Sequence, residues 1–277
     1  MSSSKPIATP KFPAPIYAET VLTHLFTDGQ QFFLKHLLHI HYAHCLMLLR
    51  QRILTRAEAR AILRGLDALD RQQILTARYD GAVEDLYFYV EHELINNIGE
   101  DLAGKLHTAR SRNDIDITLY RMKLRGDVLT LIEALRQLQA ELIQQARWHT
   151  QTVMPAHTHT QPAQPTTLAH YLSAAIEFIG RDLKRLQAAF VTINRNPLGA
   201  CAITTTGFPI NRDLTAELLG FEGLAENSYG AVAAGDYLLE AVAALAVSAL
   251  NLGKFTQDLL LWATQEFSFL TLNDAYV

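Results

Sequence analysis

The placement of proline constrains the fold of this chain more than any other feature. Five prolines lie between residues 155 and 209, and the other four crowd the first 15 residues. A proline inside a helix removes a backbone hydrogen bond and clashes with the preceding turn. The two long proline-free spans are rich in good helix formers, so the sequence predicts an all-α fold, preceded by an extended arm at residues 1–18.

Apolar residues recur every three or four positions along most of the chain, which is typical of helices with one buried face. The pattern predicts two helices within residues 30–70, the second capped by Thr55, and another over residues 83–98. Three much longer helices are expected at residues 115–150, 166–194 and 229–264, with an irregular segment at 196–227. Long helices with near-heptad stripes need partners of equal length, which favours a bundle shared between subunits.

Composition excludes several classes of protein. Of the 277 residues, 49% are hydrophobic and 19% are charged, which is typical of a globular chain. The net charge of -4 offers no basic surface for nucleic acid. Two distant cysteines, Cys45 and Cys201, and the lack of a signal-peptide pattern favour a cytoplasmic protein. The apolar stretch Ala241–Leu250 is expected to be too short to span a membrane.

A polar run, HTARSRND at residues 107–114, interrupts the apolar pattern. Buried polar groups are unfavourable unless each is paired, so a packed helix gains nothing from such a run. A site that binds carboxylates gains directed donors from Ser111, Arg112 and Asn113, because arginine offers a planar fork of N–H groups. The alternative is a capping turn, in which Ser111 or Asn113 caps the next helix and Arg112 pairs with Asp114.

A second polar run, MPAHTHTQPAQP at residues 154–165, follows the first long helix. Its three prolines predict an irregular, rigid backbone that presents Thr158, His159 and Gln161. Histidine is the side chain best suited to moving protons near neutral pH, so His159 is a candidate acid or base. The alternative for this run alone is a linker between two helices with incidental polar residues.

Four histidines, His36, His39, His41 and His44, partly share helical spacing. Such a cluster is a conceivable metal site. No acidic or cysteine ligand accompanies it at matching spacing, so the simpler interpretation is a mixed helix face, and no metal site is predicted.

Together the two polar runs resemble the argininosuccinate lyase branch of the aspartase/fumarase superfamily. That family shows HTGRSRND, here HTARSRND, and MPGYTHLQRAQP, here MPAHTHTQPAQP. The resemblance continues through NPLGACAITTTGFPINRDLTAELLGF at 196–221, ENSYGAV at 226–232 and DLLLWATQEFSFLTLNDAY at 258–276. It covers nearly all of the chain after about residue 84.

The resemblance implies a fold and an assembly. Family members are all-α homotetramers with a long central helix bundle, and their active sites form where segments from three subunits meet. We therefore expect an N-terminal helical domain at residues 1–110 and an incomplete central bundle domain at 111–277. In the family, the residues that follow the position of Val277 form a mobile signature loop with the catalytic serine, and a C-terminal domain comes after it. Neither is part of the sequence given.

The resemblance also implies a reaction. It predicts a carbon–nitrogen lyase that releases fumarate and an amine from an N-substituted L-aspartate by reversible anti β-elimination, with no metal or organic cofactor. The family motifs assign substrate binding to Ser111, Arg112, Asn113 and Thr158. They assign proton transfer or carboxylate binding to His159.

Departures from the family pattern bear on the substrate. The family motif Glu-Asp-x-His reads Glu84-Asp85-Leu86-Tyr87, and the segment Gly-Ala-Leu-Ala-Gly-Thr reads Cys201-Ala202-Ile203-Thr204-Thr205-Thr206. Together with TQPAQP, these variants most resemble family members that act on an aminopolycarboxylic acid, ethylenediamine-N,N′-disuccinate (EDDS). Two alternatives stay open: an ordinary argininosuccinate lyase, and an inactive structural relative of the lens-protein kind.

Overall fold

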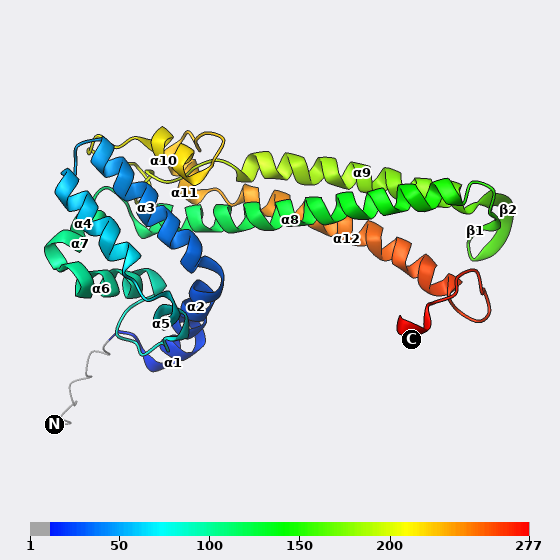
Figure 1. Cartoon of the computed structure of the whole chain (residues 1–277), viewed down its shortest axis with the longest axis horizontal. Coiled ribbons are helices and arrows are strands. Elements are labelled where there is room, and N and C mark those ends of the chain that lie inside the picture. Colours follow the sequence, from blue (N-terminus) through cyan, green and yellow to red (C-terminus); the bar gives the residue numbers. More distant parts are fainter. Residues whose placement is uncertain (1–11, 277) are drawn as a thin grey trace, which may run out of the picture. The chain divides into compact units, whose positions relative to one another are not determined.

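The structure, a computed structural model, describes residues 12–276 and divides into two compact units (Figure 1). The first unit is Met1–Lys123 with Arg195–Ala234, and the second is Leu124–Asn194 with Gly235–Val277. The domains expected from the sequence, residues 1–110 and 111–277, stay a prediction. The contact-based units divide the chain differently because the segment 195–234 packs with the N-terminal helices.

The first unit is helical throughout its described part, which confirms the predicted fold class. Its elements are α1 (Pro15–Tyr17), the π-helical turn η1 (Ala18–Leu22), α2 (Thr23–Asp28), the π-helical turn η2 (Gly29–Phe33), α3 (Leu34–Arg50), α4 (Arg56–Asp67), α5 (Arg71–Thr76), α6 (Leu86–Ile98), α7 (Glu100–Leu106), α10 (Arg212–Leu219) and α11 (Ser228–Ala233). Thr55 caps α4 in a capping box with Glu58, as predicted.

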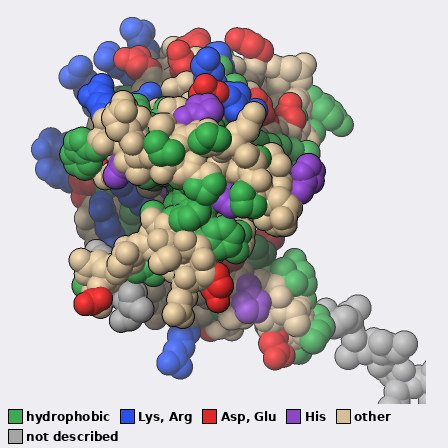
Figure 2. Space-filling view, turned by 90° about the vertical axis from the view of Figure 1, so that its right-hand side faces the viewer, with side chains coloured by type: hydrophobic (Ala, Val, Ile, Leu, Met, Phe, Trp, Pro, Cys, Tyr) green, Lys and Arg blue, Asp and Glu red, His purple; other side chains and the backbone are tan. Residues whose placement is uncertain are grey.

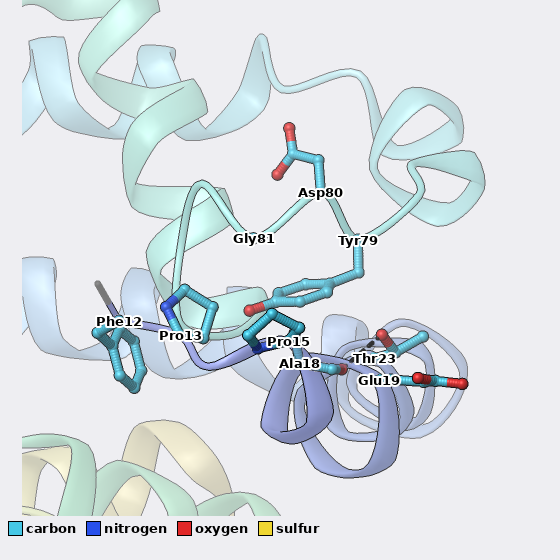
Figure 3. A pocket seen from close by; sticks show the side chains of 9 residues that line it. All are labelled: Phe12, Pro13, Pro15, Ala18, Glu19, Thr23, Tyr79, Asp80 and Gly81. Carbon is cyan, nitrogen blue, oxygen red and sulfur yellow. Dashed lines mark hydrogen bonds between the residues drawn. The ribbon is translucent and has the colours of Figure 1, made fainter. Parts of the chain in front are cut away.

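The N-terminal arm is only partly as expected. Residues 1–11 lie outside the described residues, and the chain is helical from Pro15 onward rather than extended to residue 18. The ring of Tyr79 lies beside Pro13 and Pro15 at a cavity of about 480 Å³ (Figure 3). Proline at the first position of α1 explains the helix start, because its fixed φ suits the first helical turn.

Helix α3 forms the centre of the first unit. It packs against α4, α7 and α10, and apolar side chains such as Leu37, Ile40 and Leu48 are buried along it. Two of its histidines, His41 and His44, are buried as well. Burial of this face excludes water from the polar groups that α3 directs at the turn preceding α8.

These two histidines are held neutral. The Nη1 of Arg110 donates to His41 Nδ1 at 2.8 Å, and His44 Nε2 donates to the Thr108 carbonyl at 2.8 Å. Burial, with the nearby Arg110 guanidinium, lowers the pKa of His41 well below its usual range and that of His44 to about 3. The mixed helix face expected for the histidine cluster is confirmed: His41 and His44 are neutral, buried rings, His36 is partly buried and His39 is exposed.

A buried carboxylate joins the start of α8 (Arg112–Trp148) to the loop at 196–206. Asp114 is fully buried. Its Oδ1 accepts from the Ser111 amide at 2.9 Å, and its Oδ2 accepts from the Gly199 and Cys201 amides, each at 2.8 Å. Burial raises the pKa of Asp114 despite these amides. The segment 196–227 is thus less irregular than expected, because this anchor and helix α10 order it.

The second unit contains the remaining long helices. Beyond α8, its elements are β1 (Val153–Thr158), β2 (Gln161–Thr167), α9 (Leu168–Ile193), α12 (Asp236–Trp262) and the short turn η3 (Asp274–Tyr276). Helices α9 and α12 pack side by side. The stripe predicted on α9 is buried, and Asp182 within it accepts from Asn251 of α12 at 3.0 Å.

Helix α12 packs against α9 largely through small side chains. The buried positions include Ala241, Ala244 and Ser248, whose small side chains allow close approach to α9. In the near-heptad apolar pattern expected over residues 229–264, Phe255 is buried, whereas Leu238 and Val242 are 47% and 51% exposed. Helix α12 is therefore apolar on two faces, and one of them is uncovered in a single chain.

Helix α12 as a whole is longer than the apolar stretch considered in the sequence as a membrane span. Although Ala241–Leu250 is short, the 27-residue helix is long and apolar enough, by length and composition, to cross a membrane. Helices that bury an apolar face against partner subunits pass the same test, so this finding is weak evidence for a membrane segment.

The second polar run forms a hairpin, which corrects the expected irregular backbone. Strands β1 and β2 pair antiparallel from Val153↔Thr167 to Thr158↔Gln161, with a shift in register after Pro155. Prolines are tolerated because both strands of a two-stranded hairpin are edges. Among the described residues, this hairpin is the exception to the all-α fold.

We expect Asp114→Asn to lower the free energy of unfolding by about 2–3 kcal/mol, because an amide in place of the carboxylate turns a donor toward buried backbone N–H groups. Urea unfolding measures the change. Glu141→Gln, an exposed carboxylate-to-amide change on the same helix, should shift it by less than about 0.5 kcal/mol. Equal stability of the two variants would contradict the anchoring role of Asp114.

Acid should destabilise the protein through its buried histidines. An unfolded histidine takes up a proton near pH 6.5, whereas buried His44 does so only near pH 3, so its contribution to stability falls as pH drops below 6.5. The loss from His44 alone should reach about 2 kcal/mol by pH 5. Between pH 6.5 and pH 5, His44→Gln should reduce the slope of the unfolding free energy against pH. His24→Gln, which replaces an exposed ring, should leave that slope unchanged. Identical slopes in the two variants would refute the role of His44.

Candidate functional site

The first polar run is the N-terminal turn of α8. Ser111 caps the helix: its Oγ accepts from the Asn113 amide at 3.4 Å, while Asp114 accepts from the Ser111 amide. The capping interpretation is therefore correct for Ser111, and Asp114 satisfies the backbone N–H of this cap residue. Positive partial charge at the start of a 37-residue helix lies beside these donors, which favours a bound anion.

Arg112 pairs with different carboxylates from the one expected. Its Nε donates to Asp85 Oδ2 at 3.0 Å, its Nη1 donates to Asp116 Oδ1 at 2.6 Å, and its Nη2 also contacts Asp85. Asp114 takes no part, because its oxygens are occupied by backbone amides. Burial lowers the pKa of Arg112, but the negative charges of Asp116 and Asp85 raise it by more, so the pKa lies above its usual value. Two of its five N–H groups remain for a ligand.

Tyr87 occupies the position of the family histidine and is the centre of the cluster. Its ring is buried and lies 4.8 Å from the guanidinium carbon of Arg112 and 5.6 Å from that of Arg110. His107 makes an edge contact with it at 5.4 Å. Burial raises the pKa of Tyr87 to about 12, so the hydroxyl stays protonated. Tyr87 therefore orients two arginines by cation–π contacts.

A cavity of about 430 Å³ opens beside Arg112 and Tyr87 in the first unit. The ionisable side chains that line it are mostly acids, namely Asp28, Glu84, Asp85 and Asp116. Arg112 is the single cation in this lining. Because Asp85 and Asp116 share the single positive charge of Arg112, the four acids leave a net formal charge of −3 around the cavity. The cavity therefore favours a cationic group near the arginine.

Asn113 is exposed, and its amide is oriented by the loop that follows α9. The Nδ2 donates to the Ala202 carbonyl at 2.9 Å. Cys201 and Thr205 in this loop have positive φ angles of 56° and 63°, which non-glycine residues adopt rarely. The sequence departures at 201–206 thus lie against Asn113, one of the predicted binding residues.

Thr158 and His159 lie at the tip of the β1–β2 hairpin in the second unit. His159 and Thr160 form the two-residue turn, and both have positive φ angles, of 52° and 65°. Such a conformation is strained for threonine, and strained turns are frequent at functional sites. The His157 ring packs 5.6 Å from the ring of Phe267. Figure 2 views the side of the molecule that lies at the right of Figure 1, where hydrophobic side chains group near the middle and histidines are scattered among the others.

The structure thus brings Ser111, Arg112 and Asn113 into one turn, and Thr158 and His159 into one hairpin, in different units. Sequence reasoning missed Asp85, Asp116 and Arg110 as partners. Only Asp116 carried a local signal, since it follows Arg112 by four positions on a helix. Over residues 12–276, no group of three or more His, Cys, Asp or Glu side chains converges to hold a metal ion.

Comparisons with known proteins agree with this geometry. A family model described as Lyase matches residues 34–277. Argininosuccinate lyase 2 of Agrobacterium fabrum is 44% identical over 259 residues, which cover 93% of this chain and 51% of that protein. The argininosuccinate lyase of Methanosarcina acetivorans is 42% identical over 234 residues, covering 84% and 47%.

A crystal structure of EDDS lyase in complex with formate superimposes with a TM-score of 0.82 at 36% identity, and the match covers 94% of this chain and 51% of that one. The chain therefore spans about half the length of the relatives it matches.

The match extends over most of the chain and includes both polar runs. It confirms the resemblance inferred from the motifs and the aspartase/fumarase-like fold. The chain belongs to the Lyase family, in the argininosuccinate lyase branch of the aspartase/fumarase superfamily.

Proposed function

We propose that the protein is a carbon–nitrogen lyase that releases fumarate and an amine from an N-substituted L-aspartate by reversible anti β-elimination. The observation that carries the proposal is the anchored turn of Ser111, Arg112 and Asn113 at the start of α8. Buried Asp114 fixes this turn, and exposed Asn113 and two N–H groups of Arg112 remain for a carboxylate.

In the proposed reaction, removal of a proton next to a carboxylate creates a doubly charged aci-carboxylate. Fixed donors aimed at that group lower the barrier, and Arg112, Asn113 and Thr158 are the candidates, with Ser111 supporting them. The electron pair of the broken C–H bond forms the double bond, and the amine leaves with the C–N pair. His159 binds a carboxylate or transfers a proton. In family members the base is a loop serine that follows the position of Val277. This chemistry needs no cofactor.

We propose that the working form is a homotetramer with composite active sites. The two polar runs flank α8 in the chain, and a helix of 37 residues extends about 55 Å. Exposed apolar residues on α12, among them Leu239 and Leu250, would be covered by partner subunits. A cytoplasmic location and the absence of nucleic-acid or membrane partners remain part of the proposal.

The proposed substrate is an aminopolycarboxylic acid such as EDDS, supported by the variant segments and by the similarity to EDDS lyase. The alternative, argininosuccinate, has specific support. Relatives 44% and 42% identical bear the name argininosuccinate lyase. The acidic cavity beside Arg112 suits the guanidinium of an arginine half better than additional carboxylates. An inactive structural relative is the remaining alternative, and the organised turn at Arg112 counts against it.

The polypeptide of native length should consume fumarate when supplied with an accepted amine. Ethylenediamine, arginine and simple amines are tested separately, and loss of the ultraviolet absorbance of fumarate is followed. Turnover with ethylenediamine supports the EDDS assignment, and turnover with arginine supports the alternative. Absence of turnover with every amine would remove the lyase proposal and leave the inactive relative.

Arg112→Ala should lower kcat/KM by roughly 100-fold, or about 3 kcal/mol of transition-state stabilisation, because the turn loses a charged donor. Arg60→Ala, at an exposed position on α4, should leave kcat/KM unchanged. Unfolding is measured in parallel because Arg112 also pairs with Asp85 and Asp116. Full activity in a folded Arg112→Ala variant would exclude this residue from the site.

A further inference from the structure

A cavity of about 360 Å³ lies in the first unit between the η2–α3 segment and α5, and neither polar run contributes to its lining. Its walls are apolar, formed largely by Phe32, Leu34, Leu38 and Leu75. Phe32 and Leu75 are 40% and 46% exposed, so part of this apolar wall faces solvent. The volume is within the range of about 300–1,000 Å³ that is typical of small-molecule pockets.

The charged groups that line this cavity are all basic. Lys35 and His39 stand one turn apart on α3, and Arg71 begins α5. Neither Lys35 nor Arg71 forms a salt bridge with a carboxylate in the described part of the chain. Burial, and after it the positive charges of Lys35 and Arg71, lowers the pKa of His39, so both cations lie close enough to act on this ring.

The nearby acids have other roles. Asp67 accepts the hydroxyl of Tyr42 at 2.7 Å and does not line the cavity. Asp70 caps α5 by accepting from the amides of Gln72 and Gln73 at 2.9 and 3.0 Å. An anion in the cavity would therefore meet Lys35, Arg71 and an imidazole. Arg71 also lies within hydrogen-bonding reach of the Tyr42 hydroxyl, and the nearby carboxylates are already engaged.

We infer that this cavity binds a small organic carboxylate with an apolar body, at a site separate from the Arg112 turn. Arg71 would bind the carboxylate through its planar fork, with Lys35 as a second charge and His39 as an added donor. The body of the ligand would lie against the leucine and phenylalanine walls, where burial of its apolar surface adds affinity.

Titration calorimetry and histidine NMR with phenylacetate as probe test this inference on the full chain. Phenylacetate should bind with one-to-one stoichiometry and raise the pKa of His39, because a bound carboxylate stabilises imidazolium. Arg71→Gln should weaken binding at least tenfold. Arg56→Gln provides a matched control, since Arg56 also occupies the first position of a helix, is exposed and lies outside the cavity. Its binding should stay within twofold of the original chain.

Three further probes test which features of phenylacetate the cavity recognises and whether the cavity is separate from the site proposed for fumarate. Acetate should bind at least tenfold more weakly than phenylacetate, because it lacks the apolar body. The similarly shaped cation 2-phenylethylammonium should not bind. Fumarate at saturating concentration should not displace phenylacetate. The inference would be overturned if Arg71→Gln bound phenylacetate as tightly as the original chain does. It would also be overturned if acetate or 2-phenylethylammonium bound as tightly as phenylacetate, or if fumarate displaced phenylacetate.

Discussion

The buried carboxylate of Asp114 is the interaction on which the candidate site depends. It binds three backbone amides from two segments about 85 residues apart in the chain, Ser111 on one side and Gly199 and Cys201 on the other. A buried carboxylate is costly unless its oxygens are satisfied, so this arrangement fixes both segments in one geometry. The exposed amide of Asn113 owes its orientation to that anchor.

A second constraint operates around Tyr87. In the family motif a histidine takes this position, whereas here a buried phenol ring lies near two guanidinium groups and two imidazoles. Asp85 and Asp116 pair with the same guanidinium group of Arg112. The substitution therefore replaces a titratable ring with one that stays neutral near physiological pH and binds cations through its face.

The sequence predicts those features that depend on local chemistry. The cap at Thr55, the capping role of Ser111 and the buried stripe of α9 follow from spacing and residue type. The partners of Arg112 do not, because Asp85 is 27 residues away and its contact depends on tertiary packing. The hairpin escaped prediction because prolines are usually poor in strands, and only edge strands accept them. Periodicity predicts an apolar stripe on α12, but both faces of this helix are apolar, and periodicity does not say which of them packs within the chain.

A crystal structure of the protein with bound fumarate tests the central claim most directly. The account predicts that one fumarate carboxylate contacts Ser111, Arg112 or Asn113 of one chain and that the same molecule contacts Thr158 or His159 of a neighbouring chain. Fumarate bound at high occupancy with contacts to neither the α8 turn nor the hairpin would contradict the account.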